Sequence, residues 1–531
     1  MSAIMDMLLA HAPALIIAVP LLGAFLTPLI SRVSEKGRNI FAILIVGITA
    51  LFVFLLASDV LANGTVTYVF GSTAETVRQS TVIRILFEVD ALSIFMAIIG
   101  VILSFVAVFY SYAFMKENTG LDKYYTLLLL MTTGMLGMML TGDLFNFFVF
   151  LEITSIASAA LVAFWTNKVK AVEAGFKYIV ISTIGALFFL FAIALLYGQY
   201  DALNMAKIAQ SIGLSGFTFL DKIALVIFIA ALAMKGGLAP MHMWIPDAYG
   251  RAPASISLLL VGATQASLYG LFRIVFTVYG DVLTLPSVSV GWILVLLGLV
   301  TMLVGVIMAI IQTDFKRLIG YAAVAELGYM ALAVGTGLTI VATADPMITL
   351  ESAPFAMKAI NGGLFHIIND ALDVGLLFLV AGAVYYATKE TSLNKLGGLA
   401  RNMKYTTVFF IIGLLAVAGL PPFNGFASKL LIYESTYQLN PILAIVAILS
   451  SILLLAIFVK VLHAVFLGPS LPQYKQVREV PKSMLVAMAV IAGLIIVFGL
   501  FPQVIVTQLI EPAANALVNN GAYLQWLTGG L

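Results

Sequence analysis

Long apolar stretches recur along the whole chain, and they decide what it can fold into. A helix needs about 20 mostly apolar residues to cross the hydrocarbon core of a bilayer. Fourteen stretches meet this requirement, at residues 12–31, 39–58, 88–113, 124–141, 144–166, 176–198, 222–245, 254–279, 290–312, 318–340, 357–387, 406–435, 441–467 and 482–502. Because helices satisfy their own backbone inside lipid, we predict an all-α polytopic membrane protein with about 14 transmembrane helices. The composition, 62% hydrophobic and 10% charged, is typical of that class.

The fourteen stretches fall into four segments of the chain. Residues 1–113 hold the first three transmembrane helices, 114–279 a first repeat (helices four to eight), 280–467 a second repeat (helices nine to thirteen), and 468–531 the fourteenth helix and a tail. The longest expected loops are 59–87 and 199–221. The tail stretch 503–518 is only moderately apolar, which favours an interfacial position.

The distribution of Lys and Arg predicts the orientation in the membrane. Of the 27 Lys and Arg residues, 18 lie in loops after odd-numbered stretches or at the stretch ends beside them, and six lie in the other loops or at the stretch ends beside those. The remaining three, Lys235, Lys429 and Lys460, lie inside stretches. Cytoplasmic loops carry the excess of positive charge. We therefore expect the odd-numbered loops on the cytoplasmic side of the cell membrane, with both termini outside. The first stretch begins near His11 without a basic flank, so we interpret it as a retained span.

The composition also excludes several kinds of site. The chain has no Cys, which excludes disulfides, thiolate zinc sites and cysteine-held iron–sulfur clusters within it. Four His residues leave little for a haem or metal site, so we expect no cofactor and no metal. The net charge of +2, without a dense basic stretch, predicts no nucleic-acid partner.

Two lysines stand beside breaks in predicted membrane helices. The seventh stretch contains Lys235–Pro240 (KGGLAP), and the twelfth contains Leu420–Lys429 (LPPFNGFASK). A lysine inside a bilayer is costly, and Gly and Pro break the helix. A broken membrane helix is tolerated where protein or a water-filled cavity satisfies its backbone. Interrupted helices in corresponding positions of two halves are typical of transporters.

Further charged and polar residues lie inside the stretches. His366, Asp370 and Asp373 share one helix face because they are spaced four and three apart. The candidate proton-transfer residues are Glu152, Lys235, Gln265, Glu326, His366, Asp370, Asp373, Lys429, Lys460 and His463. Intramembrane ionisable residues are functional candidates by default.

Structural alternatives apply to several of these residues. A buried Glu–Lys pair can be a packing device, and Glu326 can simply counter Lys429. Asp370 and Asp373 suit either a sodium-binding surface or a solvated half-channel. Lys460 and His463 can extend to the cytoplasmic interface.

The charged residues occur twice in the same order. Glu152 on the fifth stretch precedes Lys235 on the seventh, and Glu326 on the tenth precedes Lys429 on the twelfth. The offset of five stretches is odd, so the second unit enters the membrane from the opposite side. This pattern predicts two inverted five-helix repeats.

Four motifs resemble one known family: TGDLFNFFVFLE (141–152), KGGLAPMHMWIPDAYGRAP (235–253), QTDFKRLIGYAAVAELGYM (312–330) and LAVAGLPPFNGFASK (415–429). The family comprises the antiporter-like membrane subunits of Mrp-type sodium/proton antiporters, respiratory complex I and membrane-bound energy-converting hydrogenases. The first motif is most similar to the MrpD-type antiporter protein and its counterparts in archaeal hydrogenase or sulfur-reductase complexes.

The resemblance implies a proton channel with a central line of charged residues. It matches Glu152, Lys235 and Lys429 to the family's glutamate and two lysines. It also matches Asp314, Lys316 and Arg317 to a short structural turn on the cytoplasmic side.

The chain departs from the family pattern at its centre. Gln265 stands where the family often has a lysine, and Glu326 where it usually has an uncharged residue or a histidine. The eleventh stretch keeps the family's His366 and Asn369. It has Asp370, Asp373 and Val374 at the next family positions, which commonly hold histidine, phenylalanine and lysine.

The resemblance implies an ion-translocating subunit of a multisubunit membrane complex, with protons or sodium as the ion. A redox-driven pump and an Mrp-type antiporter both fit, and no redox chemistry is expected in this chain. The implied partners are other integral membrane subunits, lipid and, in a redox pump, peripheral subunits with iron–sulfur clusters. The alternatives are a structural subunit with an inactive channel and a stand-alone secondary transporter.

Overall fold

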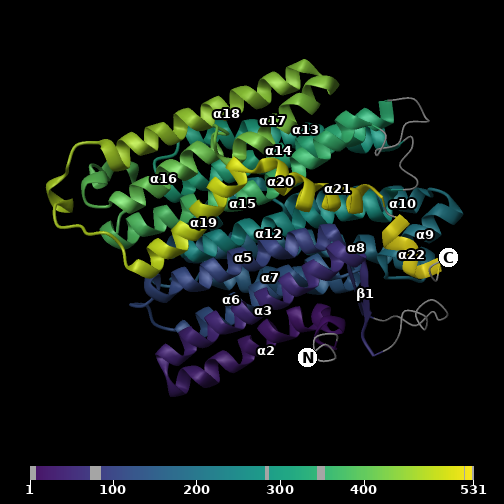
Figure 1. Ribbon diagram of the computed structural model, residues 1–531, viewed down its shortest axis with the longest axis horizontal. Helices are drawn as coiled ribbons and strands as arrows, with labels where there is room; N and C mark the ends of the chain where they lie inside the picture. Colours follow the sequence, from purple (N-terminus) through teal and green to yellow (C-terminus); the bar gives the residue numbers. More distant parts are fainter. Residues whose placement is uncertain (1–6, 72–84, 281–285, 344–352, 520, 529–531) are drawn as a thin grey trace.

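The computed structural model is a bundle of long, side-by-side helices (Figure 1). It describes residues 7–71, 85–280, 286–343, 353–519 and 521–528. The first half contains α2 (Ala12–Val33), α3 (Glu35–Asn63), α5 (Ala91–Phe114), α6 (Leu121–Leu140), α7 (Leu144–Val162), α8 (Val169–Tyr200), α9 (Met205–Ser215), α10 (Phe219–Lys235), α11 (Trp244–Arg251) and α12 (Ala254–Arg273). The second half contains α13 (Pro286–Ile310), α14 (Phe315–Thr343), α15 (Pro354–Thr388), α16 (Lys404–Val417), α17 (Asn424–Leu439), α18 (Pro441–Val461), α19 (Lys482–Leu500), α20 (Pro502–Ile505), α21 (Glu511–Val518) and α22 (Gly521–Thr528).

Eleven of the described helices are long and apolar enough to cross a membrane, and they coincide with eleven of the fourteen predicted stretches. The other three stretches differ for visible reasons. The stretch at 124–141 forms α6, whose first turn carries Asp122 and Lys123. The seventh and twelfth stretches are each split in two, into α10 and α11 and into α16 and α17. The structure is thus a helical polytopic membrane protein, and the full count of fourteen crossings stays a prediction.

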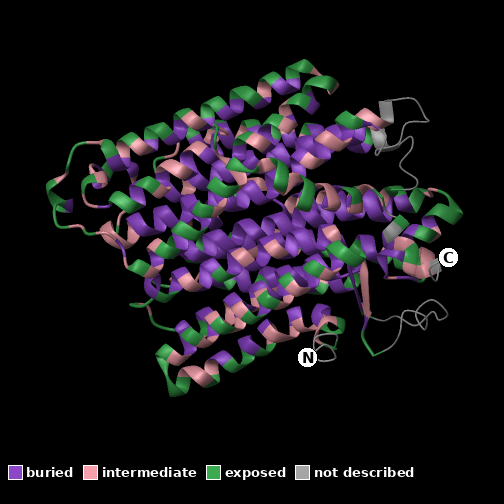
Figure 2. Ribbon diagram, in the orientation of Figure 1, coloured by how far each residue is buried: buried purple, intermediate pink, exposed green. Residues whose placement is uncertain are grey.

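Burial separates central helices from peripheral ones. In the most apolar 18-residue window of each helix, α12 and α15 are 100% buried, whereas α2 and α3 are 33% buried. Figure 2 shows this directly, with buried residues along the middle of the bundle and exposed ones at its edges. In Figure 1, α2 and α3 form one edge and α17 and α18 the opposite edge. The polar residues of α12 and α15 therefore lie in the interior of the protein.

A small β-hairpin is the exception to the all-helical expectation. Strand β1 (Val66–Val69) pairs antiparallel with β2 (Leu86–Val89), and β1 lies within the region 59–87 that was expected to be a loop. The alternating, β-branched sequence VTYV is typical of a strand. Helix α9 likewise lies within the expected loop 199–221. Figure 1 shows β1, α9 and α22 at one end of the bundle.

Candidate functional site

The first charged cluster joins α7, α8 and α10. Nζ of Lys235 lies 3.3 Å from Oε1 of Glu152 and donates to the hydroxyls of Ser155 and Ser182, each at 2.7 Å. The two hydroxyls also bond each other at 2.9 Å. The Lys235 side chain is 4% exposed, whereas that of Glu152 is 24% exposed. The ammonium is therefore buried with three oxygen partners, and the carboxylate reaches the edge of the bundle.

The break in the seventh stretch places Lys235 at the end of α10. Leu238 N–H donates to the carbonyl of Ala233 at 2.9 Å, and Gly237 takes a positive φ of 72°. This pair of features closes the helix as a Schellman motif, which needs a residue that tolerates left-handed backbone. A Cβ on Gly237 would also overlap the Ile245 side chain. The sequence GG after Lys235 therefore ends the helix beside the lysine.

A water-sized cavity lies next to Lys235. Its volume is about 10 Å³, and its lining includes Ser155, Tyr178, Lys235, Thr264 and Ser267. This is about the room that one water molecule needs, and the lining supplies several polar partners. Thr264 and Ser267 belong to α12, so the cavity connects the lysine with the central helix.

A hydrogen bond between an amide and a carboxyl group links the two central helices, α12 and α15. Nε2 of Gln265 on α12 donates to Oδ2 of Asp370 on α15 at 2.7 Å and to the carbonyl of Ile367 at 3.0 Å. Both side chains are buried, at 0% and 1% exposure. The remaining oxygens, Oε1 of Gln265 and Oδ1 of Asp370, have no hydrogen-bond partner among the described residues. The centre thus holds acceptor oxygens that are free to bind a proton or a water.

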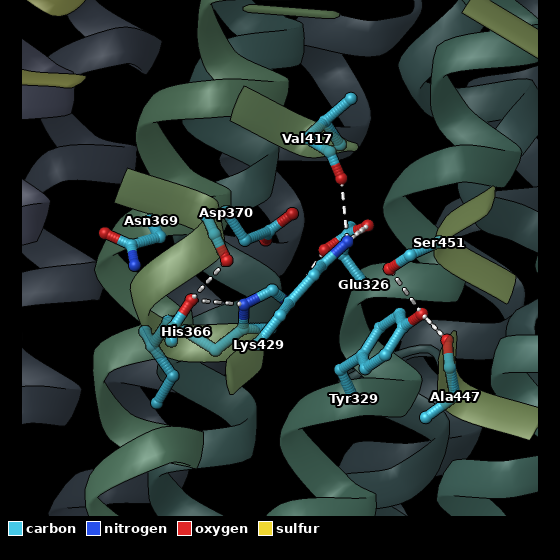
Figure 3. Close-up of polar contacts among 12 residues, drawn as sticks. Glu326, Tyr329, His366, Asn369, Asp370, Val417, Lys429, Ala447 and Ser451 are labelled. Carbon is cyan, nitrogen blue, oxygen red and sulfur yellow. Dashed lines mark hydrogen bonds and ion pairs between the residues drawn. The ribbon is translucent and has the colours of Figure 1, made fainter. Parts of the chain in front are cut away.

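The second charged cluster is centred on Glu326 of α14 (Figure 3). Its Oε1 lies 2.9 Å from Nζ of Lys429, and its Oε2 lies 2.7 Å from Nε2 of His366. Lys429 also donates to the carbonyl of Val417 at 2.7 Å, and it lies 4.6 Å from the centre of the Tyr329 ring. The Glu326 and Lys429 side chains are 2% and 1% exposed. This pair is therefore more deeply buried than the pair in the first half.

His366 links the second cluster to the centre. Its Nδ1 lies 3.1 Å from the Ser428 hydroxyl, while its Nε2 faces Glu326. Asp370 follows four residues later on the same helix, one turn away. Figure 3 shows the Asp370 side chain pointing toward Glu326 and the end of Lys429, with Asn369 on the side away from them. The structure thus places seven of the ten predicted residues in three contact groups, which we together call the interior line: Glu152 with Lys235, Gln265 with Asp370, and Glu326 with His366 and Lys429. Glu152 stands at the partly exposed end of this line.

The two helix breaks have the same local structure. Each reads Gly-Leu-X-Pro, with a positive φ at Gly237 and Gly419 and a cis bond before Pro240 and Pro422. In the second break, Leu420 N–H donates to the carbonyl of Leu415 at 3.0 Å, which repeats the Schellman contact of the first. The lysines differ in position, because Lys235 precedes its break and Lys429 follows its own. Val417 stands where Lys235 stands in the first break, and Lys429 reaches back to its carbonyl.

Three predicted residues lie apart from this line of contacts. Asp373 is buried one turn beyond Asp370, and a Cβ on Gly425 would lie 3.2 Å from its Oδ2. Lys460 and His463 are both exposed, and Lys460 donates to the carbonyl of Ile310 at 3.0 Å. Lys177, on α8, pairs with Glu173 at 2.6 Å and with Asp247 at 3.2 Å.

The sequence analysis missed an ion pair at the hairpin end of α12. Arg273 donates to both oxygens of Asp90, at 2.7 and 2.6 Å, and both residues are buried. Tyr269, one turn before Arg273, lies 3.2 Å from the Ser93 hydroxyl, which also accepts from Arg273. Gln265, Tyr269 and Arg273 are spaced four apart, so a polar stripe runs along α12 from its centre to its end. This four-residue spacing is the sequence feature from which the polar stripe could have been predicted.

Glu88 is a second missed residue, on strand β2 beside this ion pair. It is 1% exposed, and the polar groups of Tyr523 and Trp526 lie near its carboxylate without reaching hydrogen-bond geometry. Burial raises the pKa of Glu88 well above its usual value, and the nearby charge of Asp90 raises it further. Its carboxyl group packs against Gly142, where a Cβ would lie 2.9 Å from Oε2. Glu88 is thus a buried acid at the end of the polar stripe.

The comparisons with known proteins fit this geometry. The family described as NADH:quinone oxidoreductase/Mrp antiporter, transmembrane, matches residues 141–455, which is more than half of the chain. The chain belongs to this family. The matched region contains both charged clusters and the Gln265–Asp370 contact.

Relatives within the family match almost the whole chain. The N subunit of NADH-quinone oxidoreductase from Desulforudis audaxviator is 31% identical and is aligned over 95% of this chain and 98% of its own length. The D component of the Na(+)/H(+) antiporter from Alkalihalophilus pseudofirmus is 29% identical, over 94% of this chain and 95% of its own. Among solved structures, the archaeal membrane-bound sulfane sulfur reductase contains a chain with a TM-score of 0.84 and 28% identity, covering 97% of this chain and 100% of that one.

Proposed function

We propose that the chain translocates cations, primarily protons, as an antiporter-like subunit of a multisubunit membrane complex. The observation that carries this proposal is the interior line from Lys235 to Lys429 through the Gln265–Asp370 contact. Buried acids and bases are expensive inside a membrane, and they mark ion pathways. The names of the relatives, an antiporter component and a quinone oxidoreductase component, support the same class of function.

The proposed relay begins at the Glu152–Lys235 pair. When the two side chains separate, Lys235 releases a proton to the water-sized cavity beside Thr264. Gln265 carries no net charge, so its role is to orient the Asp370 carboxyl, which receives the proton. His366, one turn along α15, then carries the proton to the Glu326–Lys429 pair. The steps from Asp370 to Lys429 are local, because these groups contact each other or lie within one helical turn. The cavity is lined by Thr264 but by neither Gln265 nor Asp370, so the passage of the proton from the cavity to Asp370 is the step that no contact among the described residues bridges.

We further propose the inverted repeats, the fourteen crossings and the orientation predicted from the sequence. The matching Gly-Leu-X-Pro breaks support the repeats, since each unit carries one. The excess of Lys and Arg in loops after odd-numbered stretches supports a cytoplasmic position for those loops. Under this orientation Glu88 and the Asp90–Arg273 pair lie at the outer end of α12.

The partners are other membrane subunits, as they are for the complexes named among the relatives. For a redox-driven complex, peripheral subunits with iron–sulfur clusters would supply the energy. Affinity purification of the tagged chain in mild detergent tests this point. An iron–sulfur subunit in the purified complex supports a redox pump, whereas an assembly of membrane subunits alone supports an antiporter.

Ion flux in proteoliposomes tests the proposed function. The complex is reconstituted with Lys235→Met or Lys429→Met, and flux is followed with a pH-sensitive dye and with radioactive sodium. Each substitution removes a group that transfers a proton, so we expect proton flux to fall about 100-fold. Lys222→Met, on the exposed start of α10, is the matched control. Wild-type flux in both relay variants would refute the proposal.

A further inference from the structure

A cavity of about 300 Å³ lies at the end of the bundle that the charge pattern places in the cytoplasm. Its walls come from the end of α5, the α7–α8 loop, the α11–α12 connection, the start of α14 and the end of α15. Each of these segments lies at the end of an odd-numbered apolar stretch or directly after one, and the loops after odd-numbered stretches are the ones expected on the cytoplasmic side. The cavity therefore lies at the level where helices leave the membrane, and it is separate from the relay.

The charge lining this cavity is entirely positive. Lys168, Lys170, Arg251 and Lys316 line it, and no carboxylate does among the described residues. Arg251 is compensated by Asp314, whose Oδ2 lies 3.1 Å away. The three lysines have no carboxylate within 4.0 Å in the part of the chain that is described.

Lys316 is the buried lysine within this excess of positive charge. Three lysines of the described chain are buried, namely Lys235, Lys316 and Lys429, at 6%, 5% and 1% exposure. The other two are each paired with a glutamate, whereas Lys316 donates to the backbone carbonyl of Ala252. The charge of Asp314 acts on Lys316 from beyond 4.0 Å and is already paired with Arg251, so the buried ammonium is only partly compensated, which is costly. An anion in the cavity would remove that cost.

The rest of the lining is aromatic and aliphatic. Nζ of Lys168 lies 3.8 Å from the Trp165 ring centre, 4.7 Å from the Tyr385 ring centre and 2.6 Å from the Tyr385 hydroxyl. Phe114, Val169, Ala171 and Ala254 complete the apolar wall. Trp and Tyr at helix ends are typical of the membrane interface. The aromatic contacts fix the ammonium of Lys168 at the edge of an apolar surface.

We propose that this cavity binds one anionic phospholipid. The phosphate lies among Lys168, Lys170 and Lys316, and the first part of an acyl chain lies against Phe114 and Trp165. Basic pockets between helices on the cytoplasmic side bind anionic headgroups. A free phosphate would leave the apolar wall without a partner, so the combined lining favours a lipid. This binding site goes beyond ion translocation and does not depend on it.

Lipid binding to the purified complex tests the proposal. Native mass spectrometry counts phosphatidylglycerol and phosphatidylcholine retained per complex during titration from mixed micelles. In parallel, phosphatidylglycerol with brominated acyl chains is added, and tryptophan fluorescence is compared between wild type and Trp165→Phe. We expect one phosphatidylglycerol to bind in preference to phosphatidylcholine, with quenching that the Trp165→Phe variant lacks.

Charge variants give the expected size of the effect. At about 1 kcal/mol for each lysine near an anionic headgroup, Lys168→Gln with Lys170→Gln should weaken phosphatidylglycerol binding about 30-fold. Both residues are exposed, so the double variant should fold. Lys475→Gln with Lys482→Gln, two exposed lysines of another loop expected in the cytoplasm, is the control and should bind as wild type does.

Four results would overturn the lipid proposal. One is equal binding of phosphatidylcholine and phosphatidylglycerol, and another is equal binding by the two double variants. The third is full displacement of phosphatidylglycerol by inorganic phosphate at millimolar concentration, which would show a site for a free anion. If a copurified acidic protein segment occupied the cavity instead, crosslinking through a photoreactive residue at position 168 would capture protein rather than lipid, and the proposal would fail.

Discussion

The two Glu–Lys pairs are predicted to differ in how much each stabilises the protein. The perturbation is Glu326→Gln in the second cluster and Glu152→Gln in the first. Each change keeps the shape of the side chain and removes its negative charge. The structure predicts a large loss of stability for Glu326→Gln and a small one for Glu152→Gln.

The magnitudes follow from burial and from the partners that remain. Without the Glu326 charge, Lys429 stays 1% exposed and has only neutral partners, namely the new amide oxygen, the Val417 carbonyl and the Tyr329 ring. Breaking a buried ion pair by removing one partner costs about 3–5 kcal/mol. Without the Glu152 charge, Lys235 keeps the hydroxyls of Ser155 and Ser182. Because Glu152 is also 24% exposed, its loss should cost about 1–2 kcal/mol.

The assay is denaturant unfolding of the purified chain in a mild detergent, with Lys429→Met combined with Glu326→Gln as the double variant. We expect the double variant to recover part of the loss, because it leaves no unpaired charge on Lys429. Equal destabilisation by Glu326→Gln and Glu152→Gln would refute this reasoning. The reasoning would also be refuted if the stability loss of the double variant equalled the sum of the losses caused by its two single changes.

Two further predictions concern other parts of the fold. Glu88→Gln should leave stability unchanged below about pH 4 and raise it as pH increases. The reason is that the pKa of Glu88 is raised in the folded protein, so the wild-type protein loses stability as pH rises above the pKa that Glu88 has in the unfolded chain. Thermal melting of both proteins across a range of pH checks this, with the exposed Glu117→Gln as the control. A difference in melting temperature that does not change with pH would contradict it. Gly425→Ala should destabilise the break before α17, because the new Cβ would overlap the Ala416 carbonyl oxygen. Gly493→Ala, in open space on α19, should instead stabilise by about 0.5–1 kcal/mol, and equal melting shifts for the two glycine variants would count against this packing argument.

Much of the fold follows from local features of the sequence. Apolar length predicts eleven of the described spanning helices, because each can satisfy its backbone alone. The motif KGGLAP predicts the end of α10 at Lys235, since Gly and Pro act on the helix that contains them. The β-hairpin was not predicted, because one apolar alternation such as VTYV is short and its partner strand lies about 20 residues away in the chain.

The candidate site was predictable in its residues and less so in its contacts. Glu152 and Lys235 were both named as candidates, and they pair in the structure, because each is costly in lipid alone. The contact between Gln265 and Asp370 joins helices 105 residues apart and leaves no periodic signal in the sequence. The Asp90–Arg273 pair was missed because both residues stand at helix ends, where charges are common. Tertiary packing, which the sequence does not display, decides these contacts.

The most direct test of the central claim is proton flux through the reconstituted complex with Asp370→Asn. The asparagine oxygen can still accept from Gln265, so the packing between α12 and α15 should be retained. The account predicts flux reduced about 100-fold with an unchanged melting temperature, because asparagine cannot carry the proton. Wild-type flux in this variant would contradict a relay that passes from Lys235 to Lys429 through the centre of the protein.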